Sequence, residues 1–349
     1  MLPESQPSSQ AHDVSRGMTI AQLILSGLGL AVSLLVSVAL AIYGASGIAA
    51  SEPDFQSATA TLSVAGIFLL AAILAIPSLV FGIRHLSGRE APPPAPHPGT
   101  FRLASFGLVV WALVIVLGNS LSGIPQVSWL LLPLLQLLAT GLPVWWIFEF
   151  ARRGLSPGSP QRGWGIANFG IFITMPAIMI IEVLALLGLV LGVAVWASQN
   201  AAAMQTLTNL SELLSRAAGN PQAILPALTP YLKNPVTIFA VLAVIAGLMP
   251  MIEELLKPLA LWALAGRLTP SQGFVGGALC GAAFALIESL FYLTLPTGES
   301  WAVLAVGRTS TCLLHITTTA LVGWAMANAW EKGAYLQLGG TYLLAAALH

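Results

Sequence analysis

Acidic and basic side chains occur inside long apolar segments of this 349-residue chain, mostly in its last third. A charge at the centre of a bilayer costs about 3 kcal/mol or more, so residues of this kind are functional by default. The candidate catalytic residues are Glu253, Glu254, Glu288 and His315, and the candidate supporting residues are Lys257, Arg308 and His349. Glutamate and histidine exchange protons during hydrolysis, and both also bind metal ions.

One short segment carries two adjacent glutamates, Glu253 and Glu254, between Pro250 and Pro258. Proline lacks an N–H group, so the two prolines predict a helix that is broken or kinked around the glutamates. Such backbone is tolerated at membrane depth only when it is packed in protein or lines a wet cavity, so we expect water to reach them. Lys257 follows at a spacing that allows it to pair with either carboxylate.

The next two apolar segments carry Glu288 and His315. Phe284 precedes Glu288 by four residues, so both lie on one helix face, and Arg308 shares a face with His315 through a seven-residue spacing. Glu288 could be catalytic, could orient a partner, or could only pair with Arg308. Gly277 and Gly281 are also four residues apart, and glycines at this spacing permit close helix contact.

Four candidates are predicted to lie at one depth in the membrane. At 1.5 Å per residue, each of them lies roughly 17 to 22 Å from the predicted cytoplasmic end of its helix. They are Glu254, Glu288, His315 and His349. The agreement favours a shared site. Glu182, alone in an earlier segment, could close this site or be protonated and structural.

Hydrolysis needs a water nucleophile, a base, an oxyanion stabiliser and an acid for the leaving amine. Glu253 or Glu254 could be the base, and His315 the acid or the oxyanion stabiliser. Alternatively, a metal ion such as zinc could activate the water, with ligands from Glu254, Glu288, His315 and His349. An H-E-x-x-H zinc motif and a G-x-S-x-G nucleophile motif are both absent. Both aspartates lie outside the apolar segments, which excludes an intramembrane aspartyl pair.

The composition identifies the elements that must position these residues. Apolar side chains make up 57% of the chain and charged ones 7%, with a mean hydropathy of +0.86. These values predict an all-α polytopic transmembrane bundle, and the formal net charge of zero argues against nucleic-acid binding. The eight predicted spans are 20–43, 62–81, 103–121, 128–149, 166–196, 236–265, 273–295 and 303–329. A partial ninth stretch from Tyr335 to His349 is too short to cross, so it half-enters the membrane or the chain is truncated after His349.

The predicted regions are a cytoplasmic polar tail (1–18), a five-helix membrane region (19–197), an external amphipathic loop (198–235) and a catalytic membrane region (236–349). Arginines in the loops 82–102 and 151–163 predict that these loops and the amino terminus are cytoplasmic. The external loop contains the helical pattern of a short amphipathic helix, which could be a passive surface helix or a lid.

The ordered motifs resemble the PrsW family of intramembrane proteases, which is related to the CAAX-protease and bacteriocin-processing (CPBP) group. They are E-E-x-x-K at Glu253 to Lys257, F-x-x-x-E at Phe284 to Glu288, and the embedded His315. The resemblance covers roughly residues 236–349. It implies cleavage of a peptide bond in or beside a substrate's membrane span, in a bacterial plasma membrane, by the paired glutamates and the histidine. The implied partner is a membrane-protein substrate, for example a single-pass regulator such as an anti-sigma factor.

Two other functions use the same residues differently. In a proton-coupled transporter or channel, Glu182, Glu254, Glu288 and His315 would form a relay. A non-catalytic scaffold would bind other helices through its glycine faces and would tolerate glutamine in place of the paired glutamates. A transport path needs polar groups continuing to both surfaces, whereas a hydrolytic site clusters in one layer, and this sequence shows the cluster.

Overall fold

A computed structural model describes residues 15–89, 98–155, 158–217, 228–229, 233, 235–295 and 300–349. Within these residues the regular structure is entirely helical. Eight helical segments are long and apolar enough to cross a membrane, and a shorter apolar helix follows them. The predicted fold class is confirmed, and the chain is an integral, multi-pass membrane protein.

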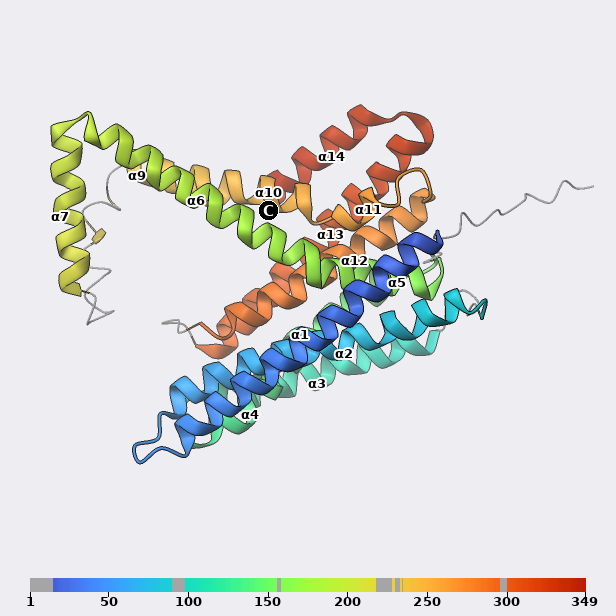
Figure 1. Cartoon of the computed structure of the whole chain (residues 1–349), viewed down its shortest axis with the longest axis horizontal. Helices are drawn as coiled ribbons and strands as arrows, with labels where there is room; N and C mark the ends of the chain where they lie inside the picture. The colour runs from blue at the N-terminus through green and yellow to red at the C-terminus, as the bar shows by residue number, and fades with distance from the viewer. Residues whose placement is uncertain are drawn as a thin grey trace, which may run out of the picture. The chain divides into compact units, whose positions relative to one another are not determined.

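The helical elements follow one another along the chain (Figure 1). They are α1 (Arg16–Ile48), α2 (Phe55–Leu86), α3 (Pro98–Ser122), α4 (Pro125–Ala151), α5 (Pro160–Phe169), η1 (Gly170–Thr174), α6 (Met175–Ser198), α7 (Ala201–Ala217), α9 (Pro235–Leu242), η2 (Ala243–Leu248), α10 (Met249–Leu256), α11 (Leu259–Trp262), α12 (Pro270–Tyr292), α13 (Trp301–Lys332) and α14 (Tyr335–Leu348).

The chain divides into two compact units. Unit 1 comprises Met1–Met175 and Lys257–Leu348, and unit 2 comprises Pro176–Leu256 together with His349. Of the predicted regions, most of the tail 1–18 and parts of the loop 198–235 lie outside the described residues. The amphipathic pattern of that loop falls on α7, which is helical as predicted.

In unit 1, α1 packs along α2 and α12 packs along α13, and α4 contacts α2, α3, α12 and α13. Local sequence sets the helix ends: Thr269 and Gln272 form a reciprocal capping box at the start of α12. Ser300 caps the start of α13, and Gly333 ends it with a left-handed φ of 71° that suits glycine.

The contact between α12 and α13 depends on glycine. A Cβ atom at Gly281 would lie 2.8 Å from the Cα of Ile316, and one at Gly277 would lie 3.0 Å from the Cα of Ala320. The two backbones therefore approach to a distance that no side chain allows, as the glycine spacing predicts. Because Ile316 is next to His315, this contact fixes the position of that histidine relative to α12.

In unit 2, the helix that carries the paired glutamates is irregular at both ends. Before Pro250 it widens into the π-helical turn η2, where Met249 N–H bonds to Val244 O. This turn lies where Pro250 cannot make the α-helical bond to Ala246. Helix α10 ends at Leu256, and α11 begins only after Pro258. The predicted break around the glutamates is confirmed.

A second π-helical turn was not predicted. It is η1, which directly precedes Met175 and Pro176. The dipeptide Met-Pro is the same signal that precedes the glutamates, and it could have revealed this irregularity.

We expect Gly281→Ala to destabilise unit 1, because overpacking a close contact typically costs about 1–3 kcal/mol. The measurement is thermal unfolding of the purified protein in detergent. Gly307→Ala is the matched control on α13, since a Cβ there has nothing within 4 Å. Equal melting temperatures for Gly281→Ala and the unaltered protein would show that the close contact does not hold α12 against α13.

Candidate active site

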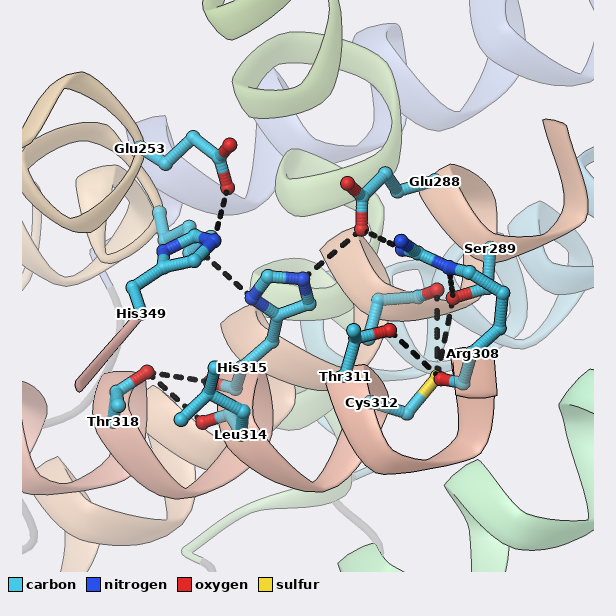
Figure 2. A network of polar contacts seen from close by, with 12 residues as sticks. Glu253, Glu288, Ser289, Arg308, Thr311, Cys312, Leu314, His315, Thr318 and His349 are labelled. Carbon is cyan, nitrogen blue, oxygen red and sulfur yellow. Dashed lines mark hydrogen bonds and ion pairs between the residues drawn. The ribbon is translucent and has the colours of Figure 1, made fainter. Parts of the chain in front are cut away.

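A continuous polar network in unit 1 joins Lys257 to His315, Glu288 and Arg308. Figure 2 shows the last three of these residues. Lys257 Nζ lies 2.9 Å from His315 Nδ1, and His315 Nε2 lies 3.0 Å from Glu288 Oε2. The same carboxylate oxygen accepts a hydrogen bond from Arg308 Nη2. Lys257 is fully buried and His315 is 2% exposed, so this network lies inside the bundle.

The contacts of His315 fix its tautomer. A lysine ammonium group can only donate, so Nδ1 of His315 accepts from Lys257 and Nε2 carries the hydrogen that Glu288 accepts. The carboxylate therefore orients the ring from behind, and the lone pair of Nδ1 points away from Glu288. This is how carboxylates orient histidines in metal and catalytic sites.

Arg308 holds the other side of Glu288. Its Nε donates to Ser289 Oγ at 3.2 Å, and its guanidinium group stacks 4.3 Å from the ring centre of Tyr292. A structural ion pair with Arg308 was one of the three roles left open for Glu288. The structure contains that pair, but Glu288 also contacts His315, so the pair alone does not describe its role.

Phe284 explains the first position of the F-x-x-x-E motif. Its ring packs edge-on against His315 at 5.1 Å and 85°, and the ammonium group of Lys257 lies 4.4 Å from its centre. A cation over an aromatic face is attracted by the ring quadrupole, most strongly when water is excluded. Phe284 thus holds both the lysine and the histidine in place.

In unit 2, the paired glutamates contact both ring nitrogens of His349. Glu254 Oε1 lies 3.1 Å from Nδ1, and Glu253 Oε2 lies 3.6 Å from Nε2. Glu254 is fully buried, whereas Glu253 is 8% exposed. The two adjacent acids are therefore not equivalent, because one is hydrogen-bonded to the imidazole and the other stands further from it.

These distances match what a metal ion needs. The separation of 3.6 Å between Glu253 and His349 exceeds an ordinary hydrogen bond. Two ligands of a tetrahedral zinc, with bonds of about 2.0–2.2 Å, lie about 3.3–3.6 Å apart. A metal-bound histidine also commonly donates the N–H of its other ring nitrogen to a carboxylate. Glu254 is placed to accept such a hydrogen bond from Nδ1 of His349. Carboxylate and imidazole are both zinc donors, so the residues present fit such an ion.

The structure groups the sequence candidates into two sets. Glu288, His315, Lys257 and Arg308 meet in unit 1, and Glu253, Glu254 and His349 meet in unit 2. Glu182 lies on α6 in unit 2 and is half-buried. Sequence reasoning missed the contact of Ser289 with Arg308, although Ser289 directly follows Glu288. It also placed Lys257 as a partner of the glutamates and did not anticipate its bond to His315.

Comparison with known proteins gives a result that agrees with the motifs. No curated protein and no solved structure matches the chain. The model of the PrsW family intramembrane metalloprotease matches residues 164–349, which includes all seven site candidates and extends further toward the amino terminus than the motifs themselves. This match spans more than half of the chain, so the chain belongs to the PrsW family of intramembrane metalloproteases.

Proposed function

We propose that this peptide hydrolase cuts a membrane-protein substrate in or near its membrane span, with Glu253, Glu254, Glu288 and His315 as functional residues. The observation that carries the proposal is that each of two histidines has a carboxylate behind it. Glu288 orients His315, and Glu254 orients His349. Paired carboxylate–histidine contacts of this kind are typical of metal sites and are not needed to stabilise a helix bundle.

We assign Glu253 and His349 of unit 2 as metal ligands, with the ion contributing Lewis-acid activation of water when bound. Glu253 and His349 have ligand spacing, whereas Nδ1 of His315 accepts a hydrogen bond from Lys257. This assignment replaces Glu254 and Glu288 as ligands, because both are engaged in orienting imidazoles.

The remaining groups have roles that follow from their contacts. Glu253 is the less buried of the paired acids, so its second oxygen takes the proton of the attacking water and returns it to the leaving amine. Lys257 brings a buried positive charge that would stabilise the oxyanion of the tetrahedral intermediate. Glu254 is a positioning residue, since it acts through His349.

The transporter alternative is not favoured, because the chain belongs to a family of proteases. We further propose that the enzyme lies in a bacterial plasma membrane with its amino terminus in the cytoplasm, as the arginine distribution indicates. A single-pass regulatory protein such as an anti-sigma factor remains our proposed substrate class, on the resemblance described above.

Substitutions at the paired glutamates should separate their roles. Glu253→Gln should abolish cleavage of tagged single-span proteins in liposomes, because glutamine accepts no proton from water. Glu254→Gln should retain activity well above Glu254→Ala, because an amide oxygen can still accept a hydrogen bond from His349 Nδ1. Glu212→Gln on the exposed surface of α7 is the control. Equal loss in both Glu254 variants would contradict the positioning role.

Metal binding can be tested without cleavage. We expect the purified protein to bind zinc, measured by calorimetry and by metal content after dialysis. Glu254→Ala should weaken binding about 10–100-fold, the usual effect of losing a carboxylate behind a ligating histidine. His349→Ala should weaken it further, and Glu212→Gln should not change it. Unchanged zinc affinity in His349→Ala would exclude this histidine as a ligand.

A further inference from the structure

A large polar cavity lies in unit 1, apart from the residues described above. Its volume is about 870 Å3, and it lies between the start of α2, the turn from α3 to α4, the end of α12 and the start of α13. Eleven of its nineteen lining residues carry hydroxyl, amide or carboxylate groups, although the chain as a whole is 57% apolar. This volume is far above the roughly 15 Å3 that one water molecule needs.

The lining of the cavity runs from exposed residues, here called the mouth, to buried residues, here called the floor. Asp54, Asn119 and Ser300 at the mouth are exposed, whereas Leu132 and Gln136 at the floor are 7% and 4% exposed. Gln136 lies eight residues beyond Ser128, where the predicted span begins, which is about 12 Å along α4. The floor is therefore well inside the hydrocarbon region of a bilayer.

The end of α12 is what opens the cavity at this depth. Gln136 Nε2 donates to the carbonyl of Leu293 at 2.8 Å, so the end of α12 is level with Gln136 and not with the membrane surface. The chain then continues as a turn through Thr294, which also lines the cavity. Non-helical backbone at membrane depth is tolerated only when it is buried in protein or lines water. The polar lining indicates the second of these.

Some of the polar groups have ordinary local roles. Asp54 and Ser300 cap α2 and α13, and Ser128 bonds back to the carbonyl of Leu121. Caps and turns account for polar residues at the mouth. Gln136, a buried amide more than two turns inside α4, bonds to the carbonyl of Leu293 at the end of α12.

The floor lies close to the network of the active site. Leu304 on α13 is one helical turn before Arg308, and Leu293, the residue that follows α12, comes four residues after Ser289. Arg308 and Glu288 have side chains 13% and 16% exposed, whereas Lys257 is fully buried.

We propose that this cavity is a water-filled vestibule that supplies water, the second substrate of hydrolysis, to the Glu288 and Arg308 end of the network. The link to hydrolysis rests on the proposed function, but the presence of water at the floor does not. Among the described lining residues Asp54 is the only ionisable one, so the vestibule is suited to water and small neutral or cationic solutes.

Cysteine labelling in proteoliposomes tests the vestibule directly, because a thiol reacts with a charged methanethiosulfonate reagent only as a hydrated thiolate. In a background with the buried Cys280→Ala and Cys312→Ser changes, Leu132→Cys and Leu304→Cys should be labelled. The controls are Leu134→Cys and Val306→Cys, which lie at nearby depths on exposed, apolar faces of the same two helices.

We expect the two vestibule positions to react at least about tenfold faster than their controls. Two positions on different helices are used so that a folding failure of one variant, detected by gel filtration, leaves the other informative. Equal rates at vestibule and control positions would overturn the proposal. Fast labelling together with failure of Glu253→Gln to stop cleavage would uphold the vestibule and refute the proposed catalytic residues.

Discussion

The burial of the Lys257 ammonium group is the constraint on which the rest of the site depends. A charged group removed from water is costly unless other groups solvate it. Here the solvating groups include the imidazole of His315 and the face of Phe284. Each must lie within a few ångströms of one nitrogen atom, so the positions of α12 and α13 are bound to that of the chain segment that follows the glutamates. The site and the packing of the bundle are therefore specified by the same contacts.

Charge balance extends this constraint along α12. One ring nitrogen of His315 contacts Lys257, and the other contacts the carboxylate of Glu288. Arg308 forms an ion pair with the same carboxylate. Lys257 and Arg308 place positive charge at both ends of the His315–Glu288 pair. Positive charge stabilises a carbonyl oxygen that gains negative charge in a transition state.

Much of this could be predicted from the sequence because membrane depth makes charged residues conspicuous. The eight spans followed from runs of apolar residues, and the broken helix followed from Pro250 and Pro258. The pairing of Glu288 with Arg308 was among the roles considered for Glu288. These inferences rely on local rules that need no knowledge of how helices pack.

The remaining features could not be predicted because they depend on which faces meet. The bond from Lys257 to His315 crosses 58 residues of sequence, so no local spacing reveals it. The unequal contacts of Glu253 and Glu254 depend on a histidine at position 349, about 95 residues away. Helix α12 ends at the level of Gln136, inside the membrane. A hydropathy profile does not reveal this end, because the last residues of the helix are apolar.

The two π-helical turns have a mechanical consequence. One precedes Pro176, where unit 2 begins, and the other precedes Pro250, shortly before that unit ends. Such turns lack the regular hydrogen-bond ladder that makes an α-helix stiff. The glutamates are thus carried by a stretch of chain with compliant joints, and a change in their direction requires the bending of a few irregular turns while every regular helix stays folded.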